Sequence, residues 1–134
     1  MPYTMQIRQL KNTVGALQGT ITTGQEELKR LAAARKSLVS HKSKLSTQKS
    51  FIMKQPIMSG EMTRGKATAR HTFFRNNMIR KNQLLVLRVQ SMINAIDKQT
   101  SSISSDISRA RTGISSARSR MSILETRQKN IEEG

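Results

Sequence analysis

The densest concentration of reactive groups in this sequence is a run of basic side chains. Fourteen Lys and Arg residues lie between Lys29 and Lys81, with a single acidic residue, Glu61, among them. Cations at this density attract phosphate groups, anionic lipid or acidic protein, and charge alone does not select among these partners. The cations that we expect to bind such a partner are Arg35, Lys42, Lys49, Arg64, Lys66, Arg70, Arg75 and Arg80.

Residues suited to catalysis or metal binding are few and do not cluster. The chain has no Cys, which excludes thiolate chemistry and disulfides. His41 and His71 lie far apart among cations, and the acidic residues lack the spacing of a metal site or an acid–base pair. No glycine-rich phosphate-binding motif is present. We therefore expect a protein without enzymatic activity, cofactor or metal.

The spacing of the aliphatic residues predicts the element that carries the first cations. From residue 7 to residue 52 they recur at alternating intervals of three and four, the heptad repeat of a coiled-coil helix. The a row holds Ile7, Val14, Ile21, Leu28, Arg35, Lys42 and Lys49. The d row holds Leu10, Leu17, Gly24, Leu31, Leu38, Leu45 and Ile52. The pattern predicts one helix over residues 4–53.

A second pair of heptad rows follows in the C-terminal half. One row holds Ile79, Val86, Ile93, Thr100, Ile107, Ile114 and Met121. The other holds Val89, Ile96, Ile103, Ala110, Ala117, Leu124 and Ile131. A helix this rich in Ser is weak in isolation, so packing of the seam must stabilise it. The pattern predicts a second helix over residues 66–131.

Residues 54–65, between the two helices, have the composition of a turn. Pro56 cannot continue a helix, and Ser59, Gly60 and Gly65 favour a change of direction. Two long helices joined by a short turn favour an antiparallel pair, and 3% aromatic residues favour a narrow seam over a rounded core. We therefore predict an all-α fold, a single elongated, coiled-coil-like helical hairpin formed by residues 1–134.

All three phenylalanines flank this turn, and we expect them to close the core across the two helix ends. The residues expected to form the turn and its core are Phe51, Pro56, Gly60, Met62, Gly65, Phe73 and Phe74.

Near the turn the seam is chemically incomplete, which suggests a partner. A cation at an a position, such as Arg35, Lys42 or Lys49, needs an acidic neighbour or a polar exit, and this part of the sequence has almost no acid. A second chain that supplies Asp or Glu would meet the need. Apolar residues 84–87 surround their helix, which indicates either a wider seam or a partner's helix. The apolar residues expected to contact a partner are Met78, Leu84, Leu85, Leu87 and Met92.

The sequence also constrains location. Its longest apolar-rich stretch, residues 84–96, is interrupted by Arg88 and is too short to span a bilayer. The N-terminal residues lack the apolar run of a signal peptide. We expect a cytoplasmic protein which, if it leaves the cell, uses a route independent of a cleaved signal.

Three segments carry a resemblance to a known family: KSLVSHKSKLSTQKSFI, GEMTRGKA and SMINAIDKQTSSISSDISRARTGISSARSRMSIL. The chain resembles the small helical helper proteins of type VII secretion in Gram-positive bacteria, which belong to the WXG-like group and accompany LXG-domain effector toxins. In those helpers a W-x-G-like element and a Lys-Ala pair follow the first helix. Here Met62 takes the place of the tryptophan, and Arg64 or Gly65 takes that of the glycine. The C-terminal Y-x-x-x-D/E export motif is absent, since Tyr3 is the only tyrosine.

The resemblance implies a non-enzymatic adaptor or targeting chaperone. Such a protein would bind the helical N-terminal domain of an LXG-type effector, beside a second small helical helper, and would support the effector's export. Without an export motif of its own, it would depend on its partner for any export of its own.

Two other interpretations rest on composition alone. The formal net charge of +16 suits a basic nucleic-acid-binding or architectural coiled-coil protein, although aromatic residues for base stacking are scarce. The heptads also suit a structural protein of a phage or filament. Binding to a membrane surface is less favoured because the apolar face is needed for the seam.

Overall fold

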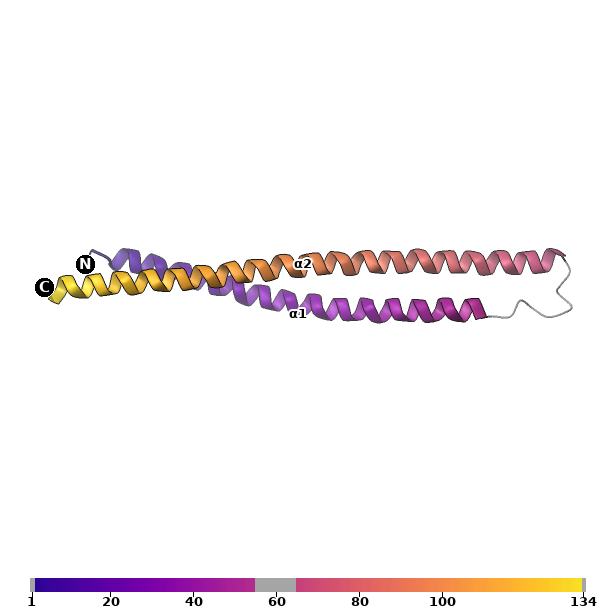
Figure 1. Cartoon of the computed structure of the whole chain (residues 1–134), viewed down its shortest axis with the longest axis horizontal. Coiled ribbons are helices and arrows are strands. Elements are labelled where there is room, and N and C mark those ends of the chain that lie inside the picture. Colours follow the sequence, from indigo (N-terminus) through magenta and orange to yellow (C-terminus); the bar gives the residue numbers. More distant parts are fainter. Residues whose placement is uncertain (1, 55–64, 134) are drawn as a thin grey trace. The chain divides into compact units, whose positions relative to one another are not determined.

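The computed structural model describes residues 2–54 and 65–133, and the regular structure in these two ranges is α-helical throughout. Helix α1 spans Thr4–Lys54 and helix α2 spans Gly65–Glu133. The two helices form an antiparallel hairpin (Figure 1). The predicted fold class is confirmed, and the predicted helix bounds differ from the observed ones by no more than two residues.

Some residues that the sequence assigned to the turn or to partner binding lie outside the described residues. These are Pro56, Gly60, Met62 and Arg64, together with the side chain of Lys66, whereas Gly65, expected in the turn, is the first residue of α2.

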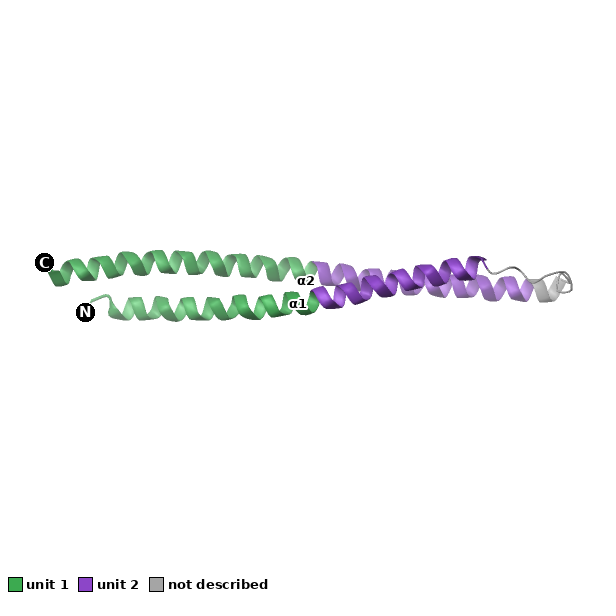
Figure 2. Ribbon diagram, turned by 90° about the horizontal axis from the view of Figure 1, so that it is seen from below, with its two compact units in different colours: residues 1–31, 98–134 green, residues 32–97 purple. Residues whose placement is uncertain are grey.

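The hairpin comprises two compact units, and each unit takes one segment from each helix (Figure 2). Unit 1 consists of residues 1–31 and 98–134, and unit 2 consists of residues 32–97. In unit 1 the N-terminal and C-terminal segments lie at the same end of the helix pair (Figure 2).

Unit 1 is held together by an aliphatic seam between the two helices. Its buried hydrophobic residues all belong to the predicted heptad rows: Val14, Ile103, Ile107, Ala110, Ile114, Ala117 and Leu124. Leu10, Leu17, Ile21 and Met121 are partly buried against one cluster of this seam. Ile131 departs from the prediction and is 56% exposed, because it lies within the last turn of α2.

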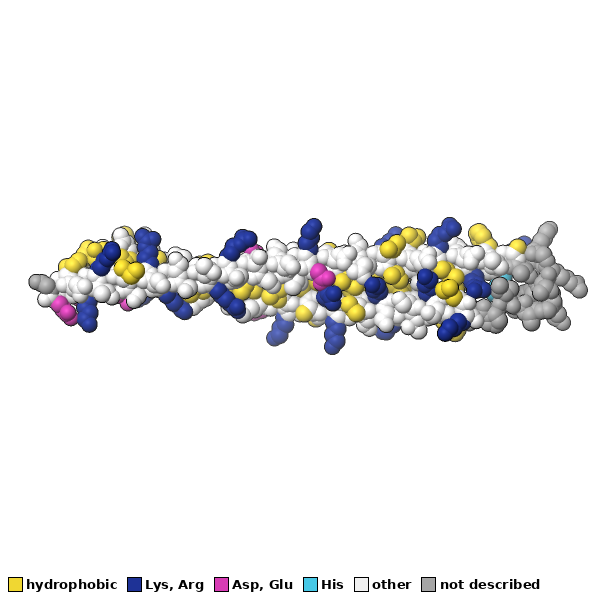
Figure 3. Space-filling view, viewed as in Figure 1, with side chains coloured by type: hydrophobic (Ala, Val, Ile, Leu, Met, Phe, Trp, Pro, Cys, Tyr) yellow, Lys and Arg dark blue, Asp and Glu magenta, His cyan; other side chains and the backbone are white. Residues whose placement is uncertain are grey.

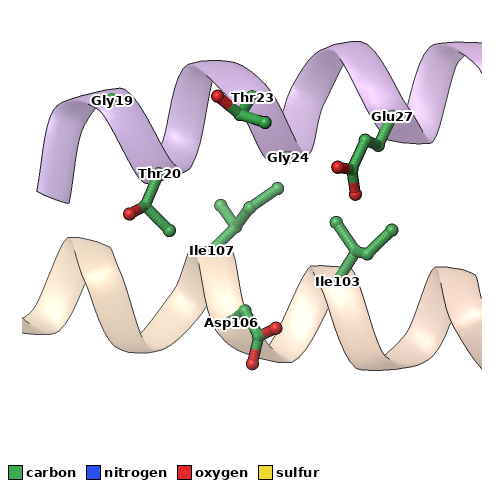
Figure 4. A pocket seen from close by; sticks show the side chains of 8 residues that line it. All are labelled: Gly19, Thr20, Thr23, Gly24, Glu27, Ile103, Asp106 and Ile107. Atoms are coloured by element: carbon green, nitrogen blue, oxygen red, sulfur yellow. The ribbon is translucent and has the colours of Figure 1, made fainter.

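At Gly24 the two helices of unit 1 approach so closely that no other residue fits without a shift. In Figure 4, Ile103 and Ile107 project from α2 toward the turn of α1 that contains Gly24. A Cβ atom at this position would lie 2.9 Å from Cγ1 and 3.0 Å from Cδ1 of Ile107. At Gly15 and Gly19 an added Cβ would meet no atom within 4 Å. The glycine in the d row therefore serves packing, whereas the other two only weaken the helix.

We expect Gly24→Ala to lower the free energy of unfolding by about 1–3 kcal/mol, because overpacking outweighs the gain in helix propensity. The matched control is Gly19→Ala, which enters open space and should raise stability by roughly 0.5–1 kcal/mol. Urea unfolding followed by circular dichroism measures both changes. Equal stabilisation by the two substitutions would show that the helices separate at Gly24 without cost.

Unit 2 has a smaller core that contains one buried polar residue. Leu45, Val89 and Ile93 form its buried cluster. Asn82 is only 4% exposed, and its Nδ2 atom donates a hydrogen bond of 2.9 Å to the backbone carbonyl oxygen of Leu45. Its Oδ1 atom is buried without a hydrogen-bond partner. Asn82 lies one heptad before Val89 in the d row, so the sequence contained the signal for this buried amide.

Candidate protein-binding surface

The seam cation Arg35 finds its acidic partner within the same chain. Its Nε atom donates to Oδ1 of Asp97 at 2.7 Å, and Nη2 donates to Oδ2 at 3.5 Å. The hydrogen bond to Asp97 and the charge of this carboxylate raise the pKa of Arg35 above its usual value. Both side chains remain about half exposed, at 48% and 50%. The acid that we expected a second chain to supply to Arg35 therefore comes from the same chain.

Lys42 also leaves the seam through a contact within the chain. Its Nζ atom donates a hydrogen bond to Oε1 of Gln90, and Nε2 of Gln90 donates to Oδ1 of Asn94. The need of Lys42 for a polar exit is therefore met without a partner, which corrects the prediction. Lys49 is partly buried and forms no ion pair with any residue that the structure describes.

The three phenylalanines do not close a core, which corrects another prediction. Phe51, Phe73 and Phe74 are 65%, 66% and 60% exposed. The heptad rows explain this: Ile52 takes the d position, which puts Phe51 at c, and the row through Ile79 puts Phe73 and Phe74 at b and c. These positions face away from the seam. The rings of Phe73 and Phe74 contact each other edge to face, with centroids 5.9 Å apart.

Exposed large hydrophobic side chains are concentrated in unit 2. Of the thirteen among the described residues, only Met5, Ile123 and Ile131 belong to unit 1. On the face shown in Figure 3, hydrophobic and basic side chains lie interspersed over unit 2. The ten in unit 2 are Val39, Phe51, Met53, Phe73, Phe74, Met78, Leu84, Leu85, Leu87 and Met92. Unit 2 therefore offers much more apolar surface than unit 1.

The five apolar residues that the sequence nominated for partner binding are exposed, but they fall on different sides of α2. Met78, Leu85 and Met92 are 53%, 45% and 54% exposed and follow one another at intervals of seven. They occupy the g row, next to the buried d row, and we call them the g stripe. Leu84 and Leu87 occupy f and b positions and are 53% and 65% exposed. The sequence treated these residues as one surface, whereas the helix separates them into two.

The cations that the sequence nominated for partner binding do not share one surface either. Arg70 and Arg80 are exposed on α2. Arg75 instead turns toward α1, because its Nη2 atom donates a hydrogen bond of 2.8 Å to the backbone carbonyl oxygen of Met53. Arg75 therefore links the two helices, and its assigned role in partner binding stays a prediction.

A hollow lies where the g stripe approaches the end of α1. It has a volume of about 280 Å³ and is lined by Phe51, Ile52, His71, Arg75 and Met78. The Nδ1 atom of His71 is buried there without a hydrogen-bond partner. The hollow has the size and the mostly apolar lining to accept one or two side chains of a partner.

Within residues 2–54 and 65–133, no three His, Asp or Glu side chains come together as a metal site would require. Neither helix contains, in its described residues, a segment that is long and apolar enough to cross a membrane.

Comparison with models of protein families gives a match over most of the chain. The model of the YwqH-like family matches residues 5–126, which is most of the 134-residue chain. No curated protein and no solved structure matches the chain. The helical hairpin with its continuous heptad seam is thus a member of the YwqH-like family.

Proposed function

We propose that this protein is a non-enzymatic adaptor that binds the helical N-terminal domain of an LXG-type effector toxin and supports its export by type VII secretion. The observation that carries the proposal is the concentration of ten exposed large hydrophobic side chains in unit 2. An accumulation of exposed large hydrophobic side chains in one part of a molecule is typical of protein interfaces. A helix hydrophobic on more than one side packs on more than one side.

Family membership supports the choice of partner. YwqH-like proteins are small helical proteins associated with LXG proteins. A helical effector domain can pack on the exposed side of a two-helix hairpin by the same heptad geometry that joins α1 and α2. In this proposal the adaptor stabilises the effector's helix, and a second small helical helper binds beside it.

The test is capture of the partner from the native host with the tagged full-length chain. The lysate is treated with nuclease and washed at about 0.3 M salt, which weakens binding driven by phosphate charge. We expect a stoichiometric larger protein with an LXG-type N-terminal region, identified by mass spectrometry. In a strain that lacks the adaptor, that effector should fall in the culture medium while its transcript stays constant. Normal export in that strain would contradict the proposal.

A second candidate function is binding to nucleic acid. It is favoured by unit 2, which contains thirteen Lys and Arg residues against two acidic residues. Such a charge suffices for nonspecific phosphate binding. The exposed rings of Phe51, Phe73 and Phe74 could stack on bases, but this candidate leaves the exposed Met and Leu residues unused, because they have no partner on a phosphate backbone. Nucleic acid retained after nuclease treatment, without a stoichiometric protein, would support it.

A further inference from the structure

On one side of the helix pair in unit 2, the g rows contain no Lys, Arg, Asp or Glu, and on α2 three of their residues are large and apolar. In an antiparallel pair the g rows of both helices border one side of the seam and the e rows border the other. The g rows of unit 2 contain only the residues Ala34, His41 and Gln48 on α1 and His71, Met78, Leu85 and Met92 on α2. In unit 1 the same row of α2 is polar and holds Gln99, Asp106, Gly113, Arg120 and Arg127. The g stripe is therefore specific to unit 2.

Two of the three seam cations make their contacts on the opposite side of the seam. Arg35 reaches Asp97, and Lys42 reaches Gln90. Asp97 and Gln90 both occupy e positions of α2. These contacts place two positive charges on the e side and leave the g side free of them.

Cations border the g stripe along its outer edge. Lys81 and Arg88 are exposed at c positions, three or four residues from the members of the stripe. At this spacing side chains on a helix are neighbours. On α1, Lys44 occupies the c position beyond the g row and is exposed as well. The chain has no acidic residue at these bordering positions, so a helix seated on the stripe would meet cations along both of its flanks.

The charge of unit 2 argues against a second copy as the occupant. Its thirteen basic and two acidic residues give a formal net charge of +11, and a second copy would bring the same charge to the interface. Nucleic acid would satisfy the bordering cations but would leave Leu85 and Met92 without an apolar partner. An acidic amphipathic helix satisfies both the stripe and its border.

We propose that the g stripe binds one amphipathic helix with acidic flanks, supplied by another protein, and that this helix completes a three-helix bundle in unit 2. The stripe spans fifteen residues from Met78 to Met92, or about 21 Å of helix, so the occupant needs roughly fifteen to twenty residues. One of its apolar side chains enters the hollow beside Met78. This inference rests on the proposed function in assuming a protein partner, but it does not require that the partner be secreted.

The test uses a synthetic helical peptide of about 21 residues with Leu and Ile at a and d positions and Glu at the flanking positions. A matched peptide carries Lys in place of every Glu. Each is labelled with a fluorophore, and binding to the full-length chain is measured by fluorescence anisotropy. We expect the acidic peptide to bind and the basic peptide to show no saturable binding.

Two chain variants locate the site. Leu85→Asp, in the stripe, should weaken binding of the acidic peptide by about tenfold or more. Leu87→Asp makes the same chemical change two residues away at a more exposed position, and it should alter binding by less than about twofold. Circular dichroism checks that both variants keep their helical content.

A second pair of variants tests the border. Lys81→Glu should weaken binding of the acidic peptide more than Arg80→Glu, which makes the same charge change at a b position on the other side of α2. The difference should shrink as salt is added, because exposed charges are screened.

Equal loss with Leu85→Asp and Leu87→Asp, or equal binding of the two peptides, would overturn the inference. So would the absence of saturable binding by either peptide. A dimer in sedimentation that Leu85→Asp dissolves would assign the stripe to a second copy instead. Binding of the acidic peptide at the stripe without capture of an LXG protein would remove the proposed function and keep this site. Capture of an LXG protein that Leu85→Asp leaves unchanged would keep the proposed function and remove this site.

Discussion

Replacing Ile93 with Ala should lower the free energy of unfolding by about 2–5 kcal/mol and melt unit 2 before unit 1. Ile93 is 3% exposed and packs in the cluster with Leu45 and Val89. The substitution removes buried methyl and methylene groups and leaves a space that a two-helix seam fills poorly. Thermal and urea unfolding followed by circular dichroism measure the loss, and hydrogen exchange of α2 locates it.

The control for this prediction is Ile123→Ala in the same helix. Ile123 is 53% exposed, so its truncation should change stability by less than about 0.5 kcal/mol. A similar loss for both variants would mean that burial in the seam does not determine the stability of this hairpin.

Asn82→Leu should have the opposite effect on stability and raise the free energy of unfolding by about 1–2 kcal/mol. Leu is close to Asn in shape, and it removes the buried Oδ1 atom that has no hydrogen-bond partner. The substitution removes the 2.9 Å hydrogen bond to the backbone carbonyl oxygen of Leu45, but this oxygen still lies within α1. A buried polar residue in a coiled-coil seam fixes register and the number of helices at a cost in stability. We therefore expect the stabilised variant to sample additional oligomers.

The measurement for Asn82→Leu is the urea midpoint together with sedimentation velocity. The control is Asn76→Leu, at an exposed e position of the same helix, which should leave both quantities nearly unchanged. A destabilised Asn82→Leu variant that remains a single species would show that the hydrogen bond to Leu45 stabilises the fold more than the buried Oδ1 atom destabilises it.

The two units of the hairpin have different packing, and the difference bears on function. In unit 1 small residues let the helices approach closely, as at Gly24 and at Gly113, where an added Cβ would lie 2.9 Å from Cδ1 of Leu17. In unit 2 the seam contains cations and a buried amide, and the apolar surplus lies outside it. Unit 2 therefore leaves ten large hydrophobic side chains exposed against three in unit 1, and these include the g stripe that we propose a third helix covers.

Much of the candidate site could be predicted from the residue types near the middle of the chain. The exposed apolar residues Leu85 and Met92 were identified as surplus to one seam, and they are exposed. Leu87 was grouped with them, although its b position in the heptad places it on another side of α2. The phenylalanines were expected to close a core because they flank the turn, whereas extension of the heptad rows to Phe51 and Phe73 places them outside the seam.

The heptad spacing is enough to place the two helices, their bounds within two residues and the rows that form the seam, because the helical period translates directly into the angular position of each side chain. Which positions of the two helices meet depends instead on how the helices pack. Arg35 lies 62 residues from Asp97 and Lys42 lies 48 residues from Gln90, and no local pattern relates such positions. Antiparallel register depends on how side chains of one helix fit between those of the other, as Ile107 does at Gly24. That register directs Arg35 and Lys42 to the e side of unit 2, away from the g stripe.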